Sequence, residues 1–250
     1  MDEGFYEEYF RIEDRHWWFV GRRRIILSVL AGQRLSRPDG AEPEILDLGC
    51  GTGTMLGHLR AFGTVRGIDA DERAVAFCRA RGEERVELLE SNRLPLPDDS
   101  LDLVTALDVL EHIEDDRGAL AEIARVLRPG GTLLATVPAY RWMWGPQDEI
   151  SHHYRRYVRD ELSEKIEASG LRLRRATYFN TLLLPAVAAV RLAHRLRPPR
   201  EVRSDFRFTR DGAVNRALAT VFASEARLLA RGDLPAGVSI MAVAGAPAAS

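Results

Sequence analysis

Cysteine and lysine are scarce in this chain of 250 residues. The scarcity of cysteine excludes a protein stabilised by a framework of disulfide bonds. Cysteine occurs only at Cys50 and Cys78, without the number or spacing of a disulfide framework or a metal-ligand set, so we expect a reduced cytoplasmic protein with no metal site. Lysine occurs once, at Lys165, although the chain has 35 basic residues. The formal net charge is −2, so composition gives no argument for nucleic acid as a partner.

Long apolar runs are also missing. The longest covers residues 182–190 and is far shorter than the ~20 residues that span a bilayer, so no transmembrane helix is expected. The acidic first residues lack the basic start of a secretory signal, and none is expected. The chain is long enough to bury a full core, and a single domain is the default expectation.

The most informative stretch is residues 45–53, I-L-D-L-G-C-G-T-G, in which an apolar strand runs into a turn of alternating glycines and then a helix. Glycines let the backbone approach a bound nucleoside where a Cβ would collide. A second apolar strand ends at Asp69, where a carboxylate can accept hydrogen bonds from both hydroxyls of an adenosine ribose. Together the two strands predict a cofactor cleft.

Four segments in this order resemble the type 11 family of class I S-adenosylmethionine-dependent methyltransferases. They are D-L-G-C-G-T-G at 47–53, L-P-L-P-D-D-S-L-D at 94–102, the apolar strand with its E-H ending at 103–112, and L-R-P-G-G-T-L at 127–133. The resemblance implies S-adenosylmethionine as the cofactor. It also implies an α/β, Rossmann-like fold with a seven-stranded, mostly parallel sheet, helices on both faces, and a last strand antiparallel beside the fifth.

The chain is expected to be one methyltransferase domain, residues 1–250, with three parts. Residues 1–40 form a helical lid, 41–138 the cofactor-binding core, and 139–250 a substrate-side loop, a helical insertion and the closing strands. Strands and helices alternate from 44 to 138, which predicts right-handed crossovers and a parallel sheet. Other expected elements are helices at 5–32, 72–81, 117–127, 159–169 and 212–231, and strands at 171–179 and 237–243.

Ten residues are assigned to the cofactor: Asp47, Gly49, Cys50, Gly51, Gly53, Asp69, Ala70, Glu90, Ser91 and Asp108. The glycines pass close to the methionine portion and Asp69 holds the ribose, whereas Asp47 orders the loop. Glu90 stands where the family often places an aspartate near the adenine amino group, and Asp108 is placed to meet the amino group of the cofactor. For each of these residues the alternative is ordinary loop capping.

A polar loop follows the fifth expected strand, at the sheet edge where α/β proteins bind ligands. His152 and His153, with Asp148 four to five residues earlier, form a candidate general-base set because histidine titrates near neutral pH. The loop resembles the D-x-x-x-x-H-x-R-R-Y pattern of a bacterial type 11 subgroup. Residues of this loop assigned to substrate binding are Tyr140, Trp144, Arg155, Arg156 and Tyr157. The alternative is a hydrogen-bonded loop that holds the next helix.

Seven of the nineteen aromatic residues lie in the first nineteen positions, which predicts a lid that excludes water from the transfer. Residues 13–19 resemble the subgroup's E-x-R-H-x-W-F entry, and Trp18 and Arg22 are assigned to the substrate. The alternative is a hydrophobic latch packed on the sheet. Residues 185–197 combine an apolar helix with a basic end, which fits a buried substrate-side helix or contact with a membrane surface or lipid-linked acceptor.

The expected function is methyl transfer from S-adenosylmethionine to an oxygen or nitrogen of a small molecule, such as a sugar or a polyketide-like or other secondary metabolite. A nicotinamide-dependent reductase is disfavoured because Thr54 stands at the third glycine position and no Tyr-x-x-x-Lys pair is present. A non-catalytic cofactor-binding scaffold, or a relative that uses the sulfonium for a reaction such as cyclisation, stays open. The sequence leaves the oligomeric state open as well.

Overall fold

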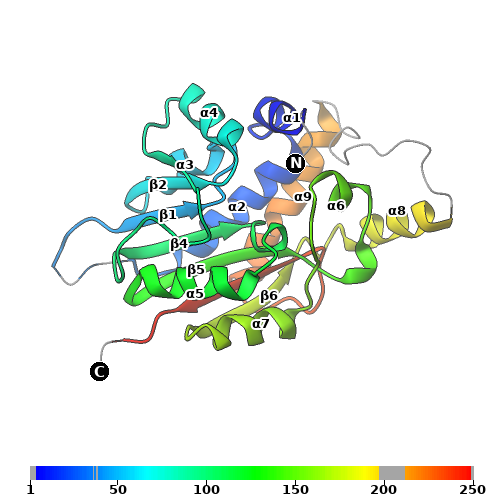
Figure 1. Ribbon diagram of the computed structural model, residues 1–250. Helices are drawn as coiled ribbons and strands as arrows, with labels where there is room; N and C mark the ends of the chain where they lie inside the picture. The colour runs from blue at the N-terminus through cyan, green and yellow to red at the C-terminus, as the bar shows by residue number, and fades with distance from the viewer. Residues whose placement is uncertain (1–3, 36, 38, 197–211, 249–250) are drawn as a thin grey trace.

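A computed structural model describes residues 4–35, 37, 39–196 and 212–248 of the chain. A seven-stranded sheet runs through the centre in the order β3-β2-β1-β4-β5-β7-β6 (Figure 1). The strands are β1 (Glu44–Leu48), β2 (Thr64–Asp69), β3 (Val86–Leu88), β4 (Leu101–Leu107), β5 (Leu127–Pro138), β6 (Arg172–Phe179) and β7 (Ser239–Gly245). All neighbouring pairs are parallel except those of β7, which is antiparallel to both β5 and β6.

Helices cover both faces of this sheet. The helices are α1 (Phe5–Ile12), α2 (Trp17–Ala31), α3 (Thr54–Leu59), α4 (Glu72–Ala80), α5 (Asp116–Val126), α6 (Pro146–Ile150), α7 (Arg159–Ala168), α8 (Leu184–Leu196) and α9 (Ala213–Leu229). Short 3-10 turns, η1 (Leu110–His112) and η2 (Arg141–Met143), follow β4 and β5. In Figure 1, α5 and α7 lie on one side of the sheet and α2 and α9 on the other, while α8 projects beyond the sheet.

The alternation of side chains along each strand divides the core into two layers. On β1, Leu46 packs with buried residues of α5 and α7, whereas its neighbour Ile45 packs with buried residues of α2, α3, α4 and α9. Both Leu46 and Ile45 are fully buried. A strand with apolar residues on both faces is what a sheet covered on both sides requires.

The expected fold class is therefore confirmed, including the antiparallel last strand beside the fifth. The single helix expected at 5–32 is wrong, because the structure has two helices with a break at residues 13–16. His16 takes an extended backbone conformation and its side chain accepts a hydrogen bond from Trp18 N–H (3.3 Å), which caps the start of α2. Within the described residues, every helix is too short or too polar to cross a bilayer. The division into lid, core and substrate side stays a prediction.

Candidate functional site

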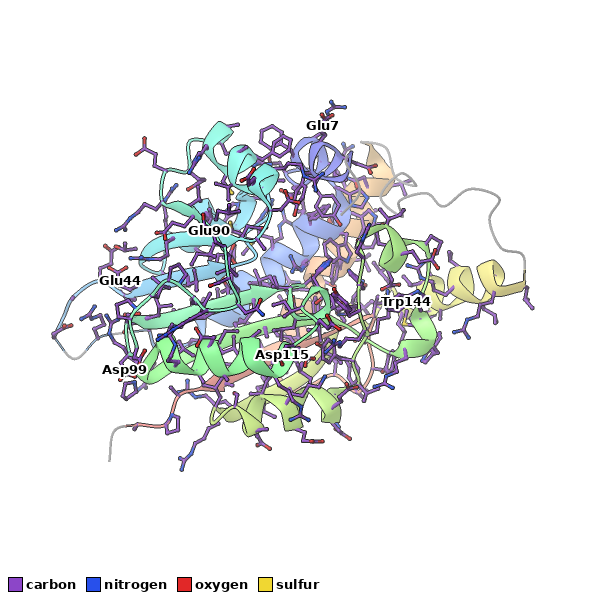
Figure 2. The ribbon with its side chains drawn as sticks, viewed as in Figure 1. Glu7, Glu44, Glu90, Asp99, Asp115 and Trp144 are labelled. Carbon is purple, nitrogen blue, oxygen red and sulfur yellow. The ribbon has the colours of Figure 1, made fainter. Side chains whose placement is uncertain are left out.

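A cavity of about 1520 Å³ opens at the carboxyl ends of β1, β2 and β4. Nine of the ten residues predicted to bind the cofactor line it: Asp47, Gly49, Cys50, Gly51, Asp69, Ala70, Glu90, Ser91 and Asp108. Glu90 and Asp115, both labelled in Figure 2, belong to its wall. Gly53 is the exception: it begins α3 with φ +85°, and a Cβ there would lie 3.0 Å from the Cys78 sulfur.

The turn after β1 depends on glycine for two different reasons. Gly49 has φ +66°, and a Cβ there would lie 2.4 Å from Cγ2 of Val109, so backbone conformation and packing both exclude a side chain. Gly51 has φ +56° and faces open space, so its backbone is exposed to the cavity. The turn therefore presents bare backbone to a ligand.

Asp69 holds this turn in place from the end of β2. Its Oδ2 accepts a hydrogen bond from Gly51 N–H (2.8 Å) and its Oδ1 from Asp71 N–H (3.0 Å). Burial raises the pKa of Asp69, although these backbone hydrogen bonds oppose the increase. Each carboxylate oxygen keeps a further lone pair for a ligand hydroxyl.

Asp47 lies beneath the turn and is almost fully buried. Burial raises its pKa to about 7, opposed by the hydrogen bond that the Thr105 hydroxyl donates to its Oδ1 (2.6 Å). This hydrogen bond ties β1 to β4, and the predicted role of Asp47 in ordering the loop stays a prediction.

Asp108 and Arg22, predicted to contact the cofactor and the substrate respectively, form an ion pair in the cavity wall. The Arg22 guanidinium lies 2.7 Å from Oδ2 of Asp108 and also donates to the Thr136 hydroxyl (3.1 Å). The same guanidinium lies over the Trp18 ring, 5.0 Å from its centre. The pair therefore joins α2 to the ends of β4 and β5.

The N-terminal segment forms one wall of the cavity, through Tyr6, Tyr9, Glu13, His16, Trp17, Trp18, Phe19, Arg22 and Arg23. Buried Glu13 ties this segment to the glycine turn, because the hydroxyls of Thr52 and Thr54 both donate to its Oε2. Arg81 of the neighbouring loop lies 3.5 Å from the same oxygen. The aromatic segment therefore lines the cavity and is tied to the glycine turn by the Glu13 carboxylate, as the latch alternative requires, whereas its role as a lid stays a prediction.

The predicted catalytic residues lie in α6, which contains Asp148, and in the loop directly after it, which contains His152 and His153. Asp148 is fully buried, and its Oδ1 lies 2.9 Å from His153 Nδ1 and 2.7 Å from Arg156 Nε. Burial opposes ionisation, yet the contacts with His153 and Arg156 lower the pKa of Asp148 to about 2. His152, His153 and Arg156 line the cavity, whereas Asp148 lies behind His153 and orients its ring.

Four predicted substrate residues lie away from this cavity. Tyr140 stacks on Tyr178, with ring centres 5.2 Å apart, and the Tyr157 hydroxyl donates to a carboxylate oxygen of Asp116 (2.7 Å). Trp144 and Arg155 border a separate cavity of about 460 Å³. Their assignment to the substrate stays a prediction.

Glu111 and His112, which form the E-H ending after β4, line the cavity although neither is among the predicted site residues. The Tyr154 backbone N–H donates to the Glu111 carbonyl (2.8 Å), and the rings of His112 and His153 lie 4.5 Å apart at their centres. Burial, followed by the charge of His153, lowers the pKa of His112 to about 3. Two acid-base residues directly after a strand end are a signal that could have identified them.

The sheet order, the glycine turn after β1 and the carboxylate at the end of β2 define the class I fold of S-adenosylmethionine-dependent methyltransferases. Residues 46–135 match the family described as "Methyltransferase domain". A probable S-adenosylmethionine-dependent methyltransferase of Mycolicibacterium smegmatis is 33% identical over 165 residues, which are 64% of this chain and 61% of the relative. These matches show that the central part of the chain is similar to S-adenosylmethionine-dependent methyltransferases.

Two solved structures agree with the fold. The methyltransferase solved with the Haloferax volcanii Trm112 activator has a TM-score of 0.63 and 22% identity, over 99% of this chain and 96% of that one. The [4+2]-cyclase SpnF has a TM-score of 0.57 and 20% identity, over 90% of this chain and 82% of that one. Among the first curated relatives, the matched part covers 37%, 61% and 44% of their length.

Proposed function

We propose that this protein transfers a methyl group from S-adenosylmethionine to an oxygen or nitrogen of a small-molecule acceptor. The observation that carries the proposal is one continuous cavity, whose wall includes both the glycine turn with Asp69 and the cluster of polar and aromatic side chains around His153. Its volume of about 1520 Å³ exceeds the roughly 300–1,000 Å³ of common ligand pockets. A cofactor and an acceptor therefore have room side by side.

The cofactor half consists of the glycine turn and the ends of β2 and β4. The residues present fit an adenosine cofactor, because Gly51 offers open space and Asp69 offers lone pairs beyond its two backbone hydrogen bonds. When bound, S-adenosylmethionine supplies a methyl group already activated by its sulfonium. We expect Glu90 and Ser91 to border the adenine and Asp108 to lie near the amino group.

The acceptor half consists of the N-terminal segment and the loop around α6. Trp18 and Phe19 give it apolar walls that exclude water, and Arg22 contributes a buried cation paired with Asp108. Holding the acceptor in line with the activated methyl group is the main task of these side chains, since orientation alone supplies about 7–11 kcal/mol in the best intramolecular reactions. We expect His153, oriented by Asp148, to accept the proton of an acceptor hydroxyl or amine. Its role as a general base stays a prediction.

The proposed range of acceptors rests on the size and lining of the cavity, and no single residue specifies the acceptor. A sugar or a polyketide-like or other secondary metabolite remains our expectation for the acceptor, and the cytoplasm for the location. Cyclisation without methyl transfer is the second candidate, because the [4+2]-cyclase SpnF shares the fold of this chain.

Isothermal titration with S-adenosylmethionine, S-adenosylhomocysteine and NADPH tests the cofactor assignment. We expect micromolar binding of the two sulfur compounds and no binding of NADPH. Asp69→Ala removes the ribose contact and the support of the turn, and should weaken binding at least tenfold. Asp160→Ala is the matched control, because Asp160 is exposed on α7 and does not line the cavity.

Release of S-adenosylhomocysteine in the presence of hydroxyl- and amine-containing acceptors then tests the transfer itself. Binding of NADPH alone would overturn the proposal. Cofactor binding with conversion of an acceptor to a product of unchanged mass would favour cyclisation.

A further inference from the structure

Three potential metal ligands meet in the wall of the cavity from two separate parts of the chain. Glu111 and His112 lie on η1 after β4, and His153 follows α6. One carboxylate oxygen and one nitrogen from each ring all lie within 4.8 Å of one another. Ligand atoms bound to one zinc-sized ion are about 3–4 Å apart, so small side-chain movements bring the three into range.

Glu111 is the independent indication of a ligand. It is fully buried, it borders the cavity, and neither of its carboxylate oxygens accepts a hydrogen bond from another residue in the described part of the chain. A buried polar group without a partner is costly and calls for an explanation. A cation in the cavity would satisfy both oxygens.

His153 is held in an orientation that suits a metal ligand. The Oδ1 of Asp148 lies 2.9 Å from Nδ1 of His153, so Nε2 is the nitrogen of this ring that would bind a metal. Asp148 is itself fixed by Arg156 at 2.7 Å and by the Gly145 backbone N–H at 2.8 Å. A carboxylate behind a ligating histidine is the usual outer shell of a metal site.

His112 completes the set from the other side. Its ring lies edge-on to that of His153, with ring centres 4.5 Å apart, so the two imidazoles face the same point in the cavity wall. Two imidazoles and one carboxylate are a donor set suited to zinc, iron or manganese, whereas magnesium and calcium prefer oxygen ligands alone.

We propose that Glu111, His112 and His153 bind one divalent transition-metal cation. Three protein ligands leave coordination positions open toward the cavity. On the basis of the proposed methyl transfer, these positions would take an oxygen of the acceptor and favour loss of its proton. The cation would lower the pKa of the acceptor oxygen, whose proton then leaves to solvent water, and His153, with its Nε2 bound to the cation, would act as a metal ligand and not as a general base.

Metal binding is measured on the full chain without cofactor or acceptor, after treatment with EDTA and desalting. Isothermal titration with Zn²⁺ and Mn²⁺, with Mg²⁺ for comparison, should give one site with a micromolar or lower Kd for a transition metal and much weaker Mg²⁺ binding. Co²⁺ should add visible d–d absorption of a site with nitrogen ligands. No binding of any of these cations at 1 mM would overturn the proposal.

Matched variants locate the site. Glu111→Gln and His153→Ala should weaken transition-metal binding at least tenfold, whereas Glu114→Gln, in an exposed glutamate of the same cavity wall, and His58→Ala, in an exposed histidine, should leave it unchanged. Equal binding in Glu111→Gln and the unaltered protein would overturn the proposal. S-adenosylhomocysteine binding should survive Glu111→Gln, so the result separates the metal site from the proposed function. It also shows that the variant is folded.

Discussion

Among single residues, Asp47 links protonation to stability. Its carboxyl group has a pKa of about 7 in the folded protein and about 3.9 in an unfolded chain, so the folded state binds the proton more tightly. Its stabilising contribution is therefore fully present below about pH 4 and is lost as pH rises through 7. The difference between these two pKa values corresponds to about 4 kcal/mol in the free energy of unfolding.

Asp47→Asn should remove this dependence, because an amide oxygen still accepts the hydrogen bond from Thr105 and carries no charge. Urea unfolding at pH 5 and pH 8 should show a smaller fall in the free energy of unfolding for the variant than for the unaltered protein. The control variant Asp160→Asn, on the surface of α7, should show the same fall in the free energy of unfolding between pH 5 and pH 8 as the unaltered protein. An identical pH dependence in Asp47→Asn would show that Asp47 stays ionised when folded.

More of the residues assigned to the cofactor than of those assigned to the substrate line the cavity. The glycines and Asp69 are separated by at most twenty residues, so local spacing was enough to group them. Glu13 could not be assigned in this way. Glu13 meets Thr52 and Thr54 from 39 and 41 positions away, and that contact depends on packing, which spacing does not encode.

At the scale of elements, Glu13 is one of the contacts that hold the centre of the N-terminal segment, together with the ion pair between Arg81 and Asp14 and the hydrogen bond from Asn215 to the Arg15 carbonyl. Glu13→Ala removes the acceptor for two hydroxyls, and a lost hydrogen bond to a charged group costs about 1.5–3 kcal/mol. We expect trypsin to cleave after Arg15 at least tenfold faster in this variant, because the segment detaches more often. Limited proteolysis followed by mass spectrometry measures the rate.

Glu7→Ala is the control for this experiment. Glu7 lies on the outer side of α1, as Figure 2 shows, and forms an exposed pair with Arg11. Such surface pairs contribute little, so cleavage after Arg15 should keep its original rate. Equal acceleration in both variants would contradict an anchoring role for Glu13.

The types and bounds of several elements were predictable from the sequence, but the break between α1 and α2 was not. The expected helix at 159–169 and the expected strand at 171–179 agree with α7 and β6 to within one residue at each end. The break between α1 and α2 was missed because residues 13–16 are all compatible with a helix. Burial of Glu13 against the glycine turn, together with capping by His16, decides the break there.

For the whole molecule, cofactor binding should raise thermal stability. A ligand that binds only the folded state, at 100 times its Kd, stabilises by about 2.7 kcal/mol, which corresponds to a rise in Tm of about 5–10 °C for a protein of this size. Differential scanning fluorimetry with S-adenosylhomocysteine measures the shift. Asp69→Ala should show little of it, and an equal shift in that variant would place the nucleoside elsewhere.

The contact between α2 and α9 has a consequence for how the chain is made. The Trp17 backbone N–H donates to the Asn215 side chain (2.8 Å), and a Cβ on Gly21 would lie 2.5 Å from the Phe222 ring, so the two helices fit closely across 198 positions of sequence. Ribosomes add about 5–20 residues per second. The nascent α2 is therefore synthesised about 10–40 s before α9, and the part of its surface that packs on α9 is not covered by that helix during this interval.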